Sequence, residues 1–98
     1  MKILALEREL PGLTASDFEP HLKSEAAAVW ELHQEGVLRE IYFRQDWPGA
    51  VLMLECESVT EAGEILEILP LVQEKLIAFD LIPLGPYPGF GRLFAQEV

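Results

Sequence analysis

Two apolar runs, residues 37–44 and 50–57, lie at the centre of the chain and are separated by the sequence Asp46-Trp47-Pro48-Gly49. A Pro-Gly turn between two runs rich in aliphatic and β-branched residues predicts a β-hairpin. Alternation predicts which side chains share a face of each strand. On the first strand, one face carries Val37, Arg39, Ile41 and Phe43, and the other carries Leu38, Glu40, Tyr42 and Arg44. On the second strand, one face carries Val51, Met53, Glu55 and Glu57, and the other carries Leu52, Leu54 and Cys56.

A helix is predicted on each side of this hairpin. The first should run from about residue 17 to residue 35, with a capping box of Ser16 and Glu19 at its start and Gly36 as its stop. The second should open on the capping box of Ser58 and Glu61 and end before Pro70. An apolar arc along the first helix indicates packing on a sheet, and its members are Phe18, Leu22, Ala26, Val29 and His33.

A further strand is predicted outside each helix. Residues 2–9 alternate, with Ile3, Ala5 and Glu7 on one face and Leu4 and Leu6 on the other. Residues 76–84 form the last apolar run, and the aromatic tail 86–94 that follows has no helical period. The order β-α-β-β-α-β predicts an α+β, ferredoxin-like fold, in which two helices cover one face of a four-stranded antiparallel sheet. Residues 1–98 are expected to form one domain.

The second face of this sheet would expose a row of apolar side chains, which is unfavourable for a monomer. Two such sheets stacked face to face would cover one another. We therefore expect a homodimer with a barrel-like centre, and the aromatic tail could reach across to the partner.

The charge balance narrows the classes of partner. A net charge of -10 argues against nucleic acid and against anionic membrane surfaces, because both attract basic proteins. No apolar run approaches the length of a membrane span. The single cysteine, Cys56, excludes an internal disulfide and fits a reducing cytoplasm.

Several short segments resemble a known family. They are the run Glu31-Leu32-His33-Gln34-Glu35-Gly36-Val37-Leu38-Arg39, the pair Glu57-Ser58, the turn Leu69-Pro70-Leu71, and Leu81-Ile82-Pro83-Leu84 before a proline-containing tail. Together they resemble the muconolactone isomerase-like proteins of the dimeric α/β-barrel group. The resemblance covers nearly the whole chain. It implies homodimers, sometimes assembled into larger rings, with a small-molecule pocket in each protomer.

Lactone isomerisation moves a proton from one carbon to another. It needs a general base, its conjugate acid and a group that stabilises an enolate-like charge, and it requires no metal or organic cofactor. The sequence has no Gly-rich phosphate loop and no His/Cys cluster. We therefore expect neither a metal site nor a cofactor.

His33 is the best acid/base candidate. It lies on the apolar arc, in the last turn of the first predicted helix, where the helix dipole favours the protonated imidazole. The alternative is a histidine at the edge of the core with one satisfied hydrogen bond.

Tyr42 and Arg44 share a strand face and could hold an enolate oxygen and a carboxylate. The alternative is a packing pair at a sheet edge. Arg39 matches the family's pattern, and it could bind a substrate carboxylate or form an ion pair at an interface.

Glu55 and Glu57 point to the same side of the second hairpin strand, where a carboxylate among Val51 and Met53 could act as a base. Glu7 is a candidate neighbour of this pair. The alternative is that these glutamates form salt bridges or lie exposed at the rim of the barrel.

Three functions follow from these observations. The first is a cofactor-free isomerase of a small unsaturated lactone, in which His33, Tyr42 and Glu55 share the proton transfer and Arg39 or Arg44 orients the anion. The second is a cofactor-free monooxygenase, whose pocket should be more apolar and have a Tyr or Trp beside the substrate. The third is a non-catalytic ligand-binding or assembly protein, which a pocket closed by its own side chains would favour.

Overall fold

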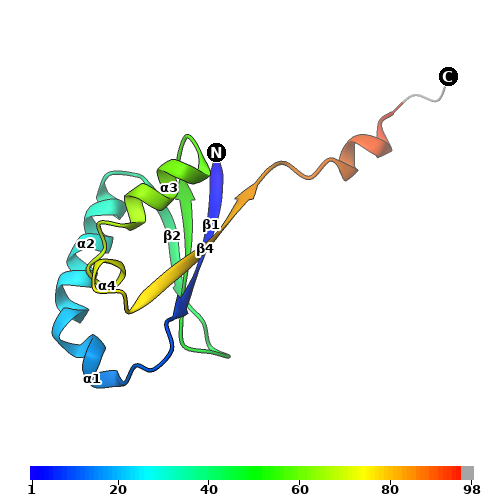
Figure 1. Ribbon diagram of the computed structural model, residues 1–98. Coiled ribbons are helices and arrows are strands. Elements are labelled where there is room, and N and C mark those ends of the chain that lie inside the picture. The colour runs from blue at the N-terminus through cyan, green and yellow to red at the C-terminus, as the bar shows by residue number, and fades with distance from the viewer. Residues whose placement is uncertain (96–98) are drawn as a thin grey trace.

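The computed structural model describes residues 1–95 and has the expected order of strands and helices (Figure 1). Its elements are β1 (Lys2–Glu9), α1 (Ala15–Phe18), η1 (Glu19–His21), α2 (Leu22–Gln34), β2 (Leu38–Phe43), β3 (Ala50–Glu55), α3 (Val59–Leu66), α4 (Pro70–Gln73), β4 (Ile77–Leu84) and η2 (Gly89–Leu93), where η marks a 3₁₀ helix.

The four strands form one antiparallel sheet in the order β2-β3-β1-β4. In Figure 1, α2, α3 and α4 lie on one side of the sheet, and no helix covers the other side. This arrangement confirms the predicted ferredoxin-like α+β fold. Within the described residues, none of the helices has the length and apolar character needed to cross a bilayer.

The core lies between the sheet and the helices. Alternation along β1 and β3 is as predicted, because Ile3 and Ala5 are buried on the helix side together with Leu52 and Leu54. The helices contribute the remaining buried apolar residues of this cluster, which include Leu32, Ala62 and Leu66. The opposite side of the sheet, called the open face below, carries Leu4, Leu6, Val51, Met53, Tyr42, Ile82 and Leu84.

The predicted faces of β2 are wrong at its start. Leu38 pairs with Leu54, but the next pair is Glu40 with Met53, so β2 advances two residues while β3 advances one. This bulge reverses the alternation. Leu38 is therefore buried on the helix side, the exposed Ile41 points to the same side, and Glu40 and Tyr42 lie on the open face.

The first helical segment starts earlier than expected and is interrupted. The backbone N–H of Thr14 donates to Asp17 Oδ2 at 2.7 Å, so the cap is Thr14 with Asp17 rather than Ser16 with Glu19. Pro20 lies in the 3₁₀ turn between α1 and α2. The predicted stop at Gly36 is confirmed, because its φ of 82° is the left-handed conformation that glycine adopts easily.

The second helical segment is capped as predicted, and Ser58 Oγ accepts from the Glu61 N–H at 3.1 Å. However, α3 ends at Leu66, and Pro70 begins a short helix, α4, that was not predicted. A proline suits the first helical position, since the N–H that it lacks would have no partner there.

Removal of the buried side chain of Ile3 should destabilise the fold. Ile3 is 0% exposed, so Ile3→Ala should lower the free energy of unfolding by about 2–5 kcal/mol in urea denaturation. Ile68→Ala is the matched control, because Ile68 is 49% exposed and should cost about 1 kcal/mol or less. Equal losses in the two variants would contradict the position of the core.

Candidate functional site

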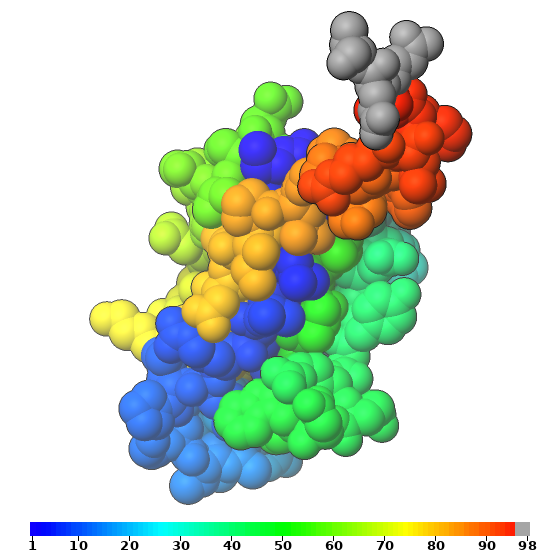
Figure 2. All heavy atoms as spheres, turned by 90° about the vertical axis from the view of Figure 1, so that its right-hand side faces the viewer, coloured from blue at the N-terminus to red at the C-terminus, as the bar shows by residue number. Residues whose placement is uncertain are grey.

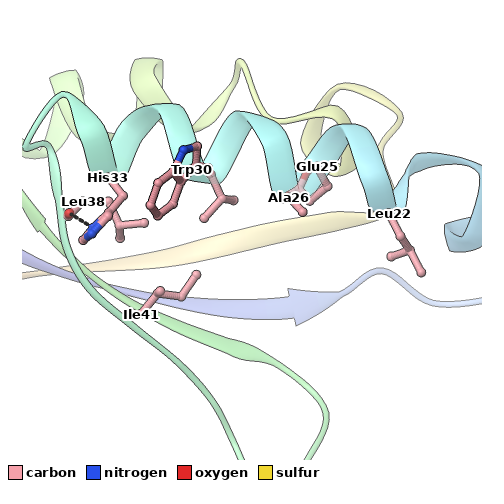
Figure 3. Close-up of a pocket in the computed structure, with 8 residues that line it drawn as sticks. Leu22, Glu25, Ala26, Trp30, His33, Leu38 and Ile41 are labelled. Carbon is pink, nitrogen blue, oxygen red and sulfur yellow. Dashed lines mark hydrogen bonds between the residues drawn. The ribbon is translucent and has the colours of Figure 1, made fainter.

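A groove of about 440 Å³ lies between α2 and β2, and its volume falls in the range of small-molecule pockets (Figure 3). Its walls are largely apolar. In Figure 3 the side chains of α2 point down toward the sheet, and Ile41 points up to meet them. The lining residues are Leu22, Glu25, Ala26, Val29, Trp30, His33, Leu38 and Ile41.

The groove exists because α2 is rotated relative to its predicted orientation. Leu32 is the buried residue of α2, and Ala28 packs against the same cluster. The predicted apolar arc therefore does not lie wholly in the core. Its members Leu22, Ala26 and His33 overhang the edge strand β2 and line the groove.

His33 lies at one end of the groove, where the structure fixes the orientation of its imidazole ring. Nδ1 lies 3.2 Å from the carbonyl oxygen of Leu38, and the Trp30 ring packs beside it at a centroid distance of 5.5 Å. A carbonyl oxygen can only accept a hydrogen bond, so Nδ1 must be the donor. In the neutral ring Nε2 is then left with a lone pair that can accept a proton.

Glu25 is a second ionisable group of the groove, and it was not predicted. The backbone N–H of Leu71 donates to Glu25 Oε1 at 2.9 Å, which ties α4 to α2. Burial raises the pKa of the Glu25 carboxyl, and the hydrogen bond from Leu71 opposes this shift. Eight residues of helix separate Glu25 from His33, which is about 12 Å along the axis. A small ring at His33 would therefore not reach Glu25.

Glu7 lines an adjoining hollow of about 300 Å³ with Phe18, Phe43 and Leu22, and Leu22 belongs to both cavities. Burial raises the pKa of the Glu7 carboxyl, the Ala50 N–H lowers it, and the charges of Glu9 and Glu25 raise it further. The alternation of β1 already assigned Glu7 to the face of Ile3 and Ala5. That pattern was the available signal for a half-buried carboxylate.

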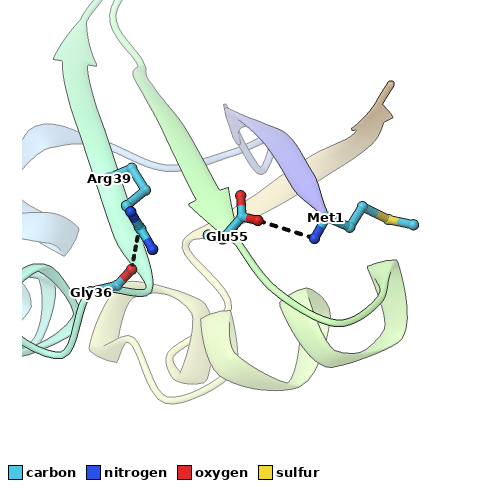
Figure 4. A network of polar contacts seen from close by, with 4 residues as sticks. All are labelled: Met1, Gly36, Arg39 and Glu55. Atoms are coloured by element: carbon cyan, nitrogen blue, oxygen red, sulfur yellow. Dashed lines mark hydrogen bonds and ion pairs between the residues drawn. The ribbon is translucent and has the colours of Figure 1, made fainter. Parts of the chain in front are cut away.

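Two of the predicted site residues, Arg39 and Glu55, meet on the open face rather than in the groove. With Lys2, Glu40 and Met53 they line a shallow hollow of about 580 Å³. Figure 4 shows that each has a separate partner: Arg39 Nε donates to the Gly36 carbonyl at 2.6 Å, and the Met1 amine donates to Glu55 Oε1 at 3.2 Å. Glu7 is not a neighbour of Glu55, because the two lie on opposite faces.

Tyr42 and Arg44 are also outside the groove. Tyr42 is exposed and stands opposite Val51 on the open face. Arg44 holds Asp46 through two hydrogen bonds of 3.0 and 2.9 Å, and this contact lowers the pKa of the Asp46 carboxyl. Arg39 and Glu55 thus line one hollow without contacting each other, and His33 lies in a different cavity from both.

Among residues 1–95, no group of three or more His, Cys, Asp or Glu side chains is placed to hold a metal ion. Cys56 is buried, and burial raises the pKa of its thiol.

The fold has a counterpart among solved structures. The chain is similar to 5-chloro-2-hydroxyhydroquinone dehydrochlorinase (TftG) from Burkholderia phenoliruptrix, solved in complex with 2,5-dihydroxybenzoquinone. The TM-score is 0.65 at 18% sequence identity, and the match covers 91% of this chain and 98% of that chain. Such low identity establishes a shared fold and no more. Neither a family model nor a curated protein matches the sequence.

The raised pKa of Glu7 predicts how stability depends on pH. The pKa of the Glu7 carboxyl is higher in the folded protein than its ordinary value of 4.5, so the folded state holds this proton to a higher pH than the unfolded state does. Ionisation of Glu7 therefore lowers the free energy of unfolding as the pH rises above 4.5. Glu7→Gln should therefore raise the urea midpoint at pH 7 and leave it nearly unchanged at pH 4. Glu64→Gln removes the same charge from an exposed site on α3 and is the control. A gain for Glu7→Gln that is equal at both pH values would contradict the assignment.

Proposed function

We propose that this protein binds a small unsaturated ring in the groove between α2 and β2 and moves a proton within it, as a cofactor-free isomerase similar to the muconolactone isomerase-like proteins. The observation that supports this most is the orientation of His33, whose Nδ1 is engaged by Leu38 while Nε2 is free to act as a base. The groove is open and apolar, which favours ligand binding over a site closed by its own side chains.

The proposed reaction transfers one proton and changes no oxidation state. His33 Nε2 removes a proton from the carbon γ to the lactone carbonyl. The electron pair of the broken C–H bond delocalises through the double bond onto the carbonyl oxygen as a dienolate. The imidazolium then returns the proton to the α carbon, and the double bond moves by one position. A ring that fills the groove would displace water from its apolar walls, which strengthens any interaction with the transient negative oxygen.

The residues of the open face belong to the second part of the proposal, a homodimer that could assemble into a larger ring. Stacking two open faces would cover Leu4, Val51 and Ile82 and would enclose the hollow of Arg39 and Glu55. Tyr42, Arg39, Arg44 and Glu55 would then act on a ligand only from inside or at the rim of this barrel. We place the protein in the cytoplasm, consistent with its single, buried cysteine.

One observation favours a second candidate function. Trp30 borders a groove with largely apolar walls, which is the environment expected for a cofactor-free monooxygenase that acts on an electron-rich aromatic. Enzyme-dependent oxygen consumption with a hydroquinone would favour this candidate. Ligand binding without turnover of either substrate class would favour the non-catalytic alternative.

Proton transfer can be measured as deuterium uptake. Muconolactone and related butenolides incubated with the protein in D₂O should gain deuterium at the α or γ carbon, observed by NMR or mass spectrometry. His33→Gln should reduce the rate by about 10²–10⁴-fold, because it removes the base. His21→Gln is the control, since His21 lies in η1 and does not line the groove. No uptake on any lactone, or equal rates for both variants, would refute the isomerase proposal.

The proposed dimer has a separate test in light scattering. The protein should have a mass at least twice the 11.0 kDa of one chain at micromolar concentration. Ile82→Asp introduces a charge into the open face and should produce monomers. Ile68→Asp is the matched control, because Ile68 is similarly exposed and lies beyond the sheet, next to α3. A monomeric wild type would exclude the barrel.

A further inference from the structure

The groove between α2 and β2 is longer than a small lactone ring needs. Its lining residues run along α2 from Leu22 to His33, and this separation of eleven residues corresponds to about 16 Å along the helix axis. Its volume of about 440 Å³ lies in the range of about 300–1,000 Å³ that holds drug-sized ligands. A five-membered ring held at His33 would therefore fill only one end of the groove.

The remaining length of the groove has apolar walls. Ala26 and Val29 of α2 line its middle, and Ile41 of β2 points up toward α2 in Figure 3. Leu22 stands at the far end and is 52% exposed, and Ile41 is 43% exposed. Covering this surface with hydrocarbon would remove it from water, which is favourable. The shape and the lining of the groove thus fit a linear apolar chain.

The far end of the groove is negatively charged. Glu25 is half-buried there, and its Oε1 accepts from the Leu71 N–H at 2.9 Å. Among the described residues that line the groove, none is a lysine or an arginine. The adjoining hollow adds Glu7 and Glu9. Like charges repel more strongly away from water, so a chain that reaches this end should carry no negative charge.

The open face suits such a chain less well. Figure 2 looks onto this face, where the strands lie side by side without a covering layer. Four of the five residues that line its hollow are charged, namely Lys2, Arg39, Glu40 and Glu55. A hydrocarbon chain placed there would displace water from those charges, which is unfavourable. The groove is therefore the favoured position for the chain.

We propose that the substrate is an unsaturated lactone with an uncharged alkyl chain, in which the ring lies at His33 and the chain runs past Ala26 toward Leu22. The inference rests on the proposed function and names the substrate class of the same site. A zigzag of C–C bonds of about 1.5 Å needs roughly six to eight carbons beyond the ring to cover the distance of about 12 Å between His33 and Glu25. Glu25 is then a specificity residue that excludes chains ending in a carboxylate.

Binding can be measured without turnover, because Trp30 lines the groove. The chain has two tryptophans, and Trp47→Phe removes the other one. In this background, γ-alkyl butenolides with chains from methyl to decyl are titrated while the fluorescence of Trp30 is recorded. Each added methylene should tighten binding by about two- to fourfold, because it leaves water for the apolar walls. The gain should stop near octyl, where the chain reaches Glu25.

Two substitutions on α2 locate the chain. Ala26→Phe fills the middle of the groove, so the octyl ligand should bind no more than about threefold tighter than the methyl ligand. Ala27→Phe is the matched control, because Ala27 is exposed like Ala26 but does not line the groove. It should keep a difference of about a hundredfold or more. An equal effect of the two substitutions would place the chain elsewhere and overturn the inference.

The role of Glu25 has its own pair of variants. An octyl chain that ends in a carboxylate should bind about tenfold or more weakly than octyl itself. Glu25→Gln should remove this difference and keep an acceptor for the Leu71 N–H, whereas Glu31→Gln, at an exposed position of α2 outside the groove, should preserve it. A difference that persists in Glu25→Gln would refute the specificity role.

The outcomes separate this inference from the proposed function. If the methyl and octyl ligands bind equally and short lactones still gain deuterium, the alkyl chain is refuted and the isomerase stands. If affinity rises with chain length and Ala26→Phe abolishes the rise, but no lactone gains deuterium, the groove is supported as an alkyl-chain site and only the isomerase is refuted. Absence of binding across the whole series would overturn the inference.

Discussion

The structure depends on one apolar contact, the packing of α2 and α3 against a single side of the four-stranded sheet. Ile3 and Ala5 from the central strand β1 meet Leu32 from α2 and Leu66 from α3 in this layer. A chain of this size has one core to stabilise it, so both helices must serve the same face of the sheet. The uncovered sheet face and the overhanging side of α2 are consequences of this arrangement.

The way in which α2 meets the sheet creates the candidate site. Burial of Leu32 orients the helix so that Trp30 and His33 stand above the edge strand instead of the sheet centre. At an edge, β2 has no outer neighbour to fill the space below the helix. An apolar groove with one imidazole follows from packing alone, and Leu38 then holds that imidazole in place.

The bulge in β2 determines which of its side chains point toward the core and which lie on the open face. The alternation reverses between Leu38 and Glu40. Leu38 therefore points into the core, whereas unbroken alternation from Ile41 would have pointed Arg39 to that side. Arg39 consequently lines the open side beside Glu55 of β3, apart from His33. Ionisable groups are thus divided between two surfaces, the groove beside α2 and the open face of the sheet.

The sequence by itself determined the order of elements, the faces of β1 and β3, the Ser58 cap and the stop at Gly36, because these follow from local periodicity and from backbone preferences of single residues. It also indicated His33 as a residue of the helix face toward the sheet. Only the tertiary structure decided the bulge, the rotation of α2 and the half-burial of Glu25. These features depend on contacts between residues distant in the chain, such as Leu71 with Glu25, and a bulge is defined by how two strands pair rather than by one strand's own sequence. The pattern of single residues therefore predicted the fold well, whereas the grouping of side chains into sites was a property of packing.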